Sequence, residues 1–471
     1  MNPGDDTAPR PPAAGERCKD DMTVPATLRR TLGKWDLVAI GVNQVIGSGI
    51  FLLPSRVTAE LNAWSVLAFI LAGMASLLVA LCFAEVGSRF EITGGPYVYT
   101  RAAFGRLVGF EVGWMQWVTR ITSWAGVANG IPLALGFYIP AMTSGMPHVL
   151  FVVGLFSLLA FINLMGVRES AWAVNFFTIS KLLPLGAFIL VGLFFVKAEP
   201  FMTYAPVSWP QASAAGLLLI FAFGGFDVVT VPAGEASNPR GQVPFAMVTT
   251  IIAVSMVMLL AQVVAMGTLP GLSTSATPLA DAAFVFLGAG GALMIGLGSV
   301  VSMTGNNAGQ VLTSSRMLFA LAEHGELPRQ VAYVHPRSRT PSVSILVSTG
   351  IAMTLALSGS FVALATASAV ARLITYTGVA AATLRLRRQE FQESVRSPTF
   401  RTPVGPLVPV LAIVVSLVIL FGASREQLMG GALALVVGII VFLLNDRING
   451  GPGSQQTVSH ESAVTWNRES E

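Results

Sequence analysis

Residues 41–51 read GVNQVIGSGIF, and their glycines interrupt an apolar segment that runs from about residue 35 to residue 55. A second interruption, FAFGGFD, lies at residues 221–227 inside another apolar segment. Glycine is the poorest helix former after proline and costs about 1 kcal/mol relative to alanine. Interrupted helices at matching places in two halves of a chain indicate the binding site of a membrane transporter. Close packing between helices is the alternative explanation for such small residues.

The composition of the chain places these segments in a membrane. Of the 471 residues, 53% are hydrophobic and only 11% are charged, and the mean hydropathy is +0.69. Soluble domains carry about 25% charged residues, so this chain has too little polar surface to cover a globule in water. The basic residues behind the net charge of +4 lie in loops between apolar segments and form no stripe. Nucleic acid is therefore not an expected partner, and the lipid bilayer is.

The apolar segments predict an all-α membrane protein with about twelve membrane helices. About 20 apolar residues span a bilayer. The third and eighth segments are longer than this and should be tilted or project from the membrane. The predicted spans are residues 35–55, 63–88, 105–138, 149–167, 170–196, 213–235, 243–268, 280–320, 341–358, 360–384, 405–422 and 428–445.

The interruptions fall in the first and sixth spans, which indicates two five-helix repeats. An odd number of crossings inverts the second repeat relative to the first. Both ends of the chain are polar, and the N-terminal end lacks the apolar core of a signal peptide. The predicted divisions are a tail at 1–34, repeat one at 35–197, repeat two at 213–386, two further helices at 404–445 and a tail at 446–471.

The distribution of lysine and arginine predicts the orientation. If the N-terminus is cytoplasmic, the outer side carries only Arg56, Lys197 and Arg425, and the other loop cations lie inside. Cytoplasmic loops of membrane proteins carry the excess of positive charge. We therefore expect a multi-pass protein of the plasma (inner) membrane with both termini in the cytoplasm.

A broken helix supplies the groups that an amino acid needs. An unwound turn in the first span leaves the amides of Ser48, Gly49 and Ile50 without partners, and the adjoining helix N-terminus adds about half a positive charge, which favours a carboxylate. The carbonyls freed by the two breaks can accept hydrogen bonds from an ammonium. A carboxylate and an ammonium a few ångströms apart define an α-amino acid. The predicted substrate-binding residues at the breaks are Ile46, Gly47, Ser48, Gly49, Ile50, Phe221, Ala222, Phe223, Gly224 and Gly225.

Several motifs resemble the amino acid–polyamine–organocation superfamily of permeases, over residues 32–446. They are IGSGIF at 46–51, GGPY at 94–97, the sixth span with GEASNPR at 234–240, and RMLFALA at 316–322 with LP at 327–328. The resemblance implies the five-plus-five inverted-repeat fold, amino acid transport and a ligand held by the broken first and sixth helices. Relatives often carry a bulkier residue in the place of Gly224, so its missing side chain should widen the pocket.

Four ionisable residues lie well inside the predicted spans, away from the span ends: Arg120, Lys181, Asp227 and Arg372. Such groups are costly in a membrane and are functional candidates by default. We predict that Arg120 and Arg372 line the pocket and favour substrates with acidic or neutral polar side chains, because AVARL at 369–373 resembles the tenth helix of cystine/glutamate exchangers. The structural alternative is that each cation pairs with Asp227 or with the freed carbonyls.

Lys181 is the predicted coupling residue, with a packing or gating role for Asp227. The segment SKLLPL at 180–185 resembles sodium-independent relatives, in which a fifth-helix lysine fills the place of a sodium ion. Burial disfavours the charged amine, whereas the carbonyls of the first break favour it. A proton on Lys181 could then couple to the conformational change, and a permanent charge would favour an exchanger.

Other classes fit the sequence less well. A membrane enzyme needs convergent catalytic groups, but the four histidines, His148, His324, His335 and His460, all lie in loops or the tail. No cofactor or metal is expected, and a channel would lack the paired breaks. A sodium symporter and a polyamine or cationic amino acid antiporter of the same fold stay open, as do the transported amino acid, the direction of transport and the oligomeric state.

Overall fold

The computed structural model describes residues 32–91, 94–136, 138–166, 171–391 and 395–448. These ranges form fourteen α-helices and contain no β-strand, only an isolated bridge between Leu32 and Ala236. The prediction of an all-α fold is confirmed. The two predicted tails lie largely outside the described residues.

The first half of the chain contains a helix, or a pair of helices, at each of the first five predicted spans. A short helix, α4 (Pro96–Phe104), replaces what the sequence indicated as a loop. Pro96 at the first helical position and the positive φ of Gly105 at its end (88°) explain where α4 begins and ends. The other elements are α1 (Lys34–Val45), α2 (Gly49–Leu61), α3 (Trp64–Gly87), α5 (Arg106–Leu135), α6 (Gly145–Leu164) and α7 (Ala171–Gly192).

The second half also contains a helix at each predicted span, with one unexpected break. Gly288 has non-helical dihedrals (φ 64°, ψ −159°) inside α10, so the long eighth span consists of a short helix before this glycine and a longer one after it. The sequence indicated that this span is tilted or projects from the membrane and did not predict the break. The elements are α8 (Trp209–Ala222), η4 (Phe226–Glu235), α9 (Pro239–Thr268), α10 (Pro278–Glu323), α11 (Ser342–Ser358), α12 (Phe361–Arg385), α13 (Leu407–Phe421) and α14 (Arg425–Ile448).

Length and hydropathy identify membrane spans among these helices. In the described part of the chain, eight helices are long and apolar enough to cross a bilayer, and nine if the bent pair α1 and α2 counts as one span. The protein is therefore an integral, multi-pass membrane protein. The count of twelve spans and the inverted repeat stay predictions.

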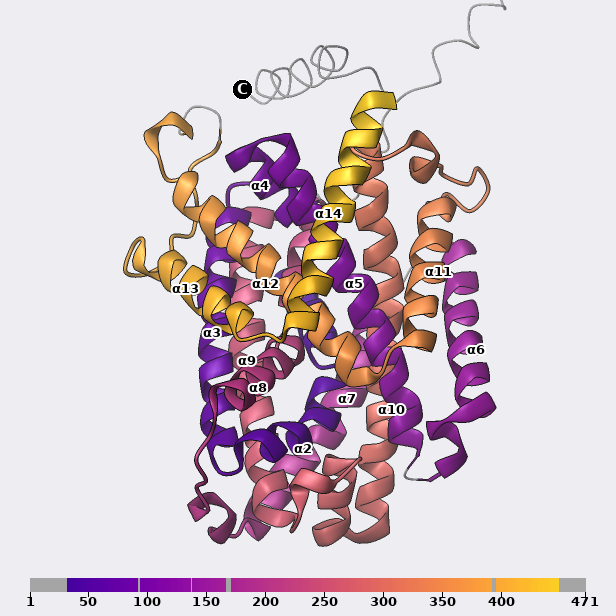
Figure 1. The fold of residues 1–471 in the computed structure, drawn as a ribbon, viewed down its shortest axis with the longest axis vertical. Coiled ribbons are helices and arrows are strands. Elements are labelled where there is room, and N and C mark those ends of the chain that lie inside the picture. Colours follow the sequence, from indigo (N-terminus) through magenta and orange to yellow (C-terminus); the bar gives the residue numbers. More distant parts are fainter. Residues whose placement is uncertain (1–31, 92–93, 137, 167–170, 392–394, 449–471) are drawn as a thin grey trace, which may run out of the picture.

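The helices pack around the two interrupted spans. The first helix pair lies in the interior, where α1 packs on α9 and α2 on α8, while α5 packs against α10 and α12. Helices α6 and α11 lie along one edge of the bundle and α13 along the opposite edge, while α14 crosses in front and packs on α5 and α12 (Figure 1). Large apolar side chains on these outer helices are exposed, such as Leu158, Leu346, Val414 and Leu433. Such side chains face lipid once the protein is in a membrane.

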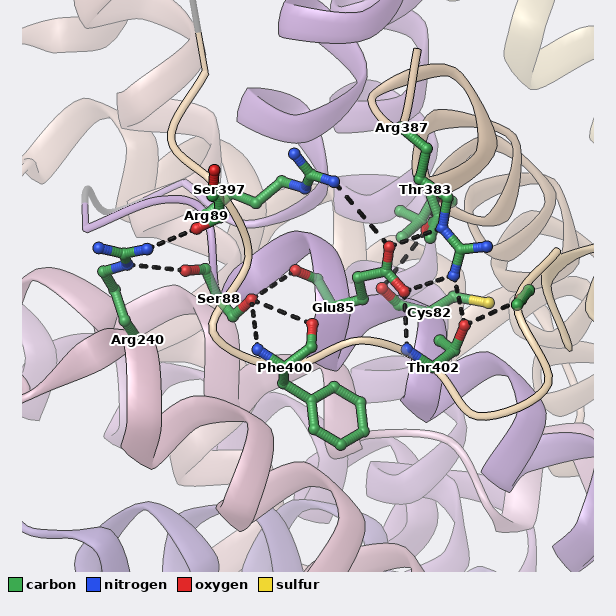
Figure 2. Close-up of polar contacts among 12 residues, drawn as sticks. Cys82, Glu85, Ser88, Arg89, Arg240, Thr383, Arg387, Ser397, Phe400 and Thr402 are labelled. Carbon is green, nitrogen blue, oxygen red and sulfur yellow. Dashed lines mark hydrogen bonds and ion pairs between the residues drawn. The ribbon is translucent and has the colours of Figure 1, made fainter. Parts of the chain in front are cut away.

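A polar network joins the end of α3 to the chain that follows α12 (Figure 2). Nε and Nη2 of Arg387 donate to the two carboxylate oxygens of Glu85 at 2.7 and 2.6 Å, and the amide of Thr402 donates to the same carboxylate at 2.8 Å. These bonds favour the charged guanidinium and raise the pKa of Arg387 above its ordinary value. Arg240, at the start of α9, donates to the Ser88 carbonyl at 3.0 Å. The network fixes three membrane helices at one end of the bundle.

Candidate functional site

The first predicted break is present between α1 and α2. Helix α1 ends at Val45 and α2 begins at Gly49, and the two helix axes differ by 45°. The amides of the first turn of a helix have no partner within that helix. The amides of Gly49 and Ile50 stand in this position, next to Ser48, as the sequence predicts.

The second predicted break is present between α8 and η4, and it touches the first. Gly225 separates them with φ 127°, a value that favours glycine. A Cβ atom at Gly225 would lie 2.7 Å from the Gln44 carbonyl oxygen, and one at Gly49 would lie 2.8 Å from Ala222 Cα. The backbones of the broken spans are therefore in direct contact. The space beside Gly49 is taken by α8, so this glycine serves the helix packing that the sequence left as an alternative.

Lys181 reaches the first break from α7 and is fully buried. Its Nζ donates to the carbonyl oxygens of Asn43 at 2.9 Å and Ile46 at 2.7 Å, with the Ser302 carbonyl at 3.5 Å. The hydroxyl of Ser302 also donates to the Ile46 carbonyl, at 3.0 Å. Three backbone carbonyl oxygens therefore surround the Lys181 ammonium. The Ile46 carbonyl, expected to receive the substrate ammonium, already has two protein donors.

Arg120 and Asp227 form an ion pair between α5 and η4. The pair is buried, and Gln116 on α5 also donates to the Asp227 carboxylate, at 3.0 Å. The structural alternative for Arg120, pairing with Asp227, is thus present. The contact ties the segment that follows the second break to α5, which fits a gating or packing role for Asp227.

Arg372, on α12, lies against Gly224, which overturns one expectation. A Cβ atom at Gly224 would lie 1.3 Å from Nη1 of Arg372, so the guanidinium fills the space that the missing side chain was expected to add to the pocket. Arg372 is 2% exposed, and its Nε and Nη1 have no hydrogen-bond partner among the described residues. Asp227 is close enough for its charge to interact with both arginines.

The sequence interpretation missed a polar face on α10. Asn306 donates to the Gln44 carbonyl at 2.8 Å, and Gln310 contacts the Ser123 hydroxyl of α5 at 3.4 Å. Both side chains are buried beside the first break. Amides four positions apart in an apolar span share one helix face, which was the available signal.

The fold and the site define a class of protein: a multi-pass membrane transporter built on two broken helices that meet in its interior. Comparison with known proteins agrees, because the amino acid permease family matches residues 32–444, and the chain belongs to that family. It is therefore a transporter of the amino acid permease type and not an enzyme.

Three relatives from Bacillus subtilis show how wide this family is. The chain is 27% identical over 445 residues to the branched-chain amino acid permease BcaP, covering 89% of this chain and 94% of the relative. It is 27% identical over 442 residues to the methylthioribose transporter, with coverage of 89% and 94%, and 27% identical over 431 residues to the serine/threonine exchanger SteT, with coverage of 88% and 95%. Because the chain is equally similar to transporters named for three different substrates, its own substrate has to be inferred from the residues at the helix breaks.

Proposed function

We propose that the protein carries an amino acid by alternating access and holds it where the two broken helices meet. The observation that carries the proposal is the direct contact between the breaks, at Gly49 with Ala222 and at Gly225 with Gln44. The amides that begin α2 receive the substrate carboxylate, because a helix N-terminus is an anion site. The carbonyls that end α8 receive its ammonium, since the Ile46 carbonyl is already engaged by Lys181.

Transport proceeds without sodium, because Lys181 supplies the cation. Its ammonium already holds the Asn43 and Ile46 carbonyls, at 2.9 and 2.7 Å, and so ties α7 to α1. A sodium ion at the same point would place two positive charges together in a buried site, which is strongly unfavourable. The same contacts argue against the sodium-symporter alternative.

The substrate carries an acidic or a neutral polar side chain. Arg120 and Arg372 contribute two positive charges to a buried cluster in which Asp227 contributes one negative charge. A buried charge without a partner is costly, and a substrate carboxylate would accept charge-assisted hydrogen bonds from the Arg372 guanidinium, whose Nε and Nη1 have no partner among the described residues. This surplus of positive charge also argues against a polyamine or a cationic amino acid as the cargo.

The coupling runs through Lys181. In its charged form, the lysine tethers α7 to α1, and loss of the proton weakens that tether. A proton that prefers one conformation shifts the equilibrium between the two, as any ligand does. Net uptake is then driven by a pH gradient, whereas a lysine that keeps its charge leaves the protein as an exchanger.

Uptake into proteoliposomes tests the proposal. A panel of labelled amino acids is offered with and without sodium, with and without a pH gradient, and with and without amino acid inside. Analogues of the best substrate that lack the carboxylate or the ammonium should compete poorly, because each loses one of the two backbone sites. A sodium requirement would overturn the role of Lys181, and full competition by both analogues would overturn the backbone site.

A further inference from the structure

A cavity of about 740 Å³ opens on the surface of the bundle. Its walls come from the end of α2, from α3, α8 and α13, and from the chain before α8, and its lining side chains are apolar or aromatic, including Leu67, Leu71 and Ile419. The volume lies in the range of small-molecule sites, about 300–1,000 Å³. A lining without charged side chains excludes the amino acid substrate and favours a hydrocarbon ligand.

The cavity faces the lipid bilayer. Leu71, on its wall, is 55% exposed, and Ile70 and Met74 continue the exposed apolar face of α3 beside it. At its mouth the rings of Trp64 and Tyr204 pack together with centroids 4.7 Å apart. Tryptophan and tyrosine concentrate at the level of the lipid head groups. The mouth thus lies at the membrane surface, and the groove runs inward from it.

The length of the groove matches one leaflet. Along α3 it is lined from Trp64 to Ala75, which at 1.5 Å per residue is about 17 Å. Half of a hydrocarbon core that is about 30 Å thick is about 15 Å. The groove therefore has the length of a single extended acyl chain and ends near the bilayer centre.

We propose that this groove is a binding site for one acyl chain of a membrane lipid, from the leaflet on the side of Trp64. The chain packs against α8 at Gly216, Leu219 and Ile220, just before α8 ends at Ala222. Phe69 on α3 packs on Phe223 in the break itself, with ring centroids 6.3 Å apart. Bound lipid therefore supports the outer half of the broken sixth helix. This inference stands independently of the transported substrate.

A photoactivatable phospholipid tests the site. The purified protein is reconstituted in vesicles that contain phosphatidylcholine with a diazirine on one acyl chain, and labelled peptides are identified by mass spectrometry. We expect α3 residues 64–75 and α8 residues 212–220 to be labelled severalfold more than α6, whose Leu158 and Phe161 are exposed to bulk lipid. A diazirine in the head group should label the groove poorly.

Matched leucine variants show whether the labelling comes from the groove. Gly216→Leu fills it: a Cβ there makes only ordinary contacts, 3.7 and 3.9 Å from side-chain atoms of Ile419, and leucine is the better helix former. Gly350→Leu on α11 is the control, since a Cβ there has nothing within 4 Å. Ala68→Leu is a second groove variant in case the first does not fold.

The groove variants should lose the excess labelling severalfold, and Gly350→Leu should keep it. Equal labelling of α3 and α6 in the unmodified protein would mean ordinary surrounding lipid only, and would overturn the proposal. So would cross-links from this face to a second copy of the chain, or full labelling in the groove variants.

Discussion

Two buried cations, Lys181 and Arg372, stand beside the two helix breaks, in spans that are equivalent under the predicted repeat. Lys181 holds two backbone carbonyls within 3 Å and has a third at 3.5 Å. Arg372 fills the space beside Gly224, yet its Nε and Nη1 have no hydrogen-bond partner among the described residues. The backbone alone supplies hydrogen-bond acceptors to Lys181, whereas two donors of Arg372 have no acceptor among the described residues.

The difference follows from the chemistry of the two groups. An ammonium is a compact charge with three donors, and it fits a ring of carbonyls as a metal ion does. A guanidinium carries five donors in a planar fork that matches a carboxylate. Buried polar groups in native proteins are almost always hydrogen-bonded. Lys181 thus has its partners in the backbone of the first break, whereas Arg372 keeps donors that, under the proposed function, a substrate carboxylate would engage.

Loss of the lysine should have the largest effect. Lys181→Ala removes the Lys181 donor from the Asn43 carbonyl and leaves the Ile46 carbonyl with the Ser302 hydroxyl alone, at roughly 1–3 kcal/mol for each lost hydrogen bond. Because each 1.4 kcal/mol is a factor of ten, we expect net uptake to fall by about a hundredfold and to lose its pH dependence, while part of the substrate binding persists. The uptake rate and the equilibrium affinity for substrate are measured in proteoliposomes at several pH values between about pH 5 and pH 8.

Lys197→Ala provides the control for this variant, because Lys197 is an exposed lysine between α7 and α8. It should leave uptake unchanged. Unaltered pH dependence in Lys181→Ala would contradict the coupling role and reduce Lys181 to a structural residue.

Replacement of the arginine should change selectivity and leave the overall fold intact. Arg372→Lys keeps the charge but cannot bind a carboxylate in a bidentate way. Hydrogen bonds to charged groups contribute about 1.5–3 kcal/mol, so competition by glutamate and aspartate should weaken by about 10- to 100-fold. Inhibition constants against a labelled substrate measure the change, with Arg425→Lys at an exposed position as control. Unchanged competition, or lysine as the best competitor, would refute an acidic-substrate pocket.

Gly224→Ala tests Arg372 without changing the arginine itself, because the added methyl group displaces its guanidinium. Gly224 has no positive φ, so Gly224→Ala acts only through the collision of its Cβ with the Arg372 guanidinium. Overpacking costs about 1 kcal/mol or more, and we expect glutamate competition to weaken about fivefold. Gly186→Ala on α7, where a Cβ has nothing within 4 Å, is the control. Stronger glutamate binding in Gly224→Ala would show that Arg372 does not need this space.

The smallest effect on transport should come from an arginine that is fully paired. Arg387→Gln removes the double hydrogen bond to Glu85 and should lower the melting temperature by a few degrees, at about 1–3 kcal/mol, without changing substrate selectivity. The pKa of Arg387 is raised, so its stabilisation is lost only as pH rises beyond the usual arginine range. The melting temperature difference from Arg388→Gln, an exposed control, should therefore stay constant from about pH 6 to pH 9. A changed preference among amino acids in Arg387→Gln would contradict this prediction, because it would show that an arginine paired at one end of the bundle also affects substrate selectivity.

Much of the architecture could be predicted because its signals are local. Hydropathy alone located a helix at each predicted span, and the glycines at 47–49 and 224–225 located both breaks. The helix α4 was missed because its mixed polar and apolar residues carry no membrane signal, and the break at Gly288 because a lone glycine is tolerated in many helices. The role of each candidate site residue stays a prediction.

The sequence by itself determined that this protein lies in a membrane, that two of its helices break, and that cations lie at depth, because helix propensity and transfer from water depend on each residue and its near neighbours. Only the tertiary structure decided what those groups meet. Lys181 reaches carbonyls 138 and 135 positions away, Arg372 occupies the space of Gly224, and Arg120 pairs with Asp227 across 107 positions. Such partners are chosen by the packing of helices that are distant in the chain, and no local pattern encodes them.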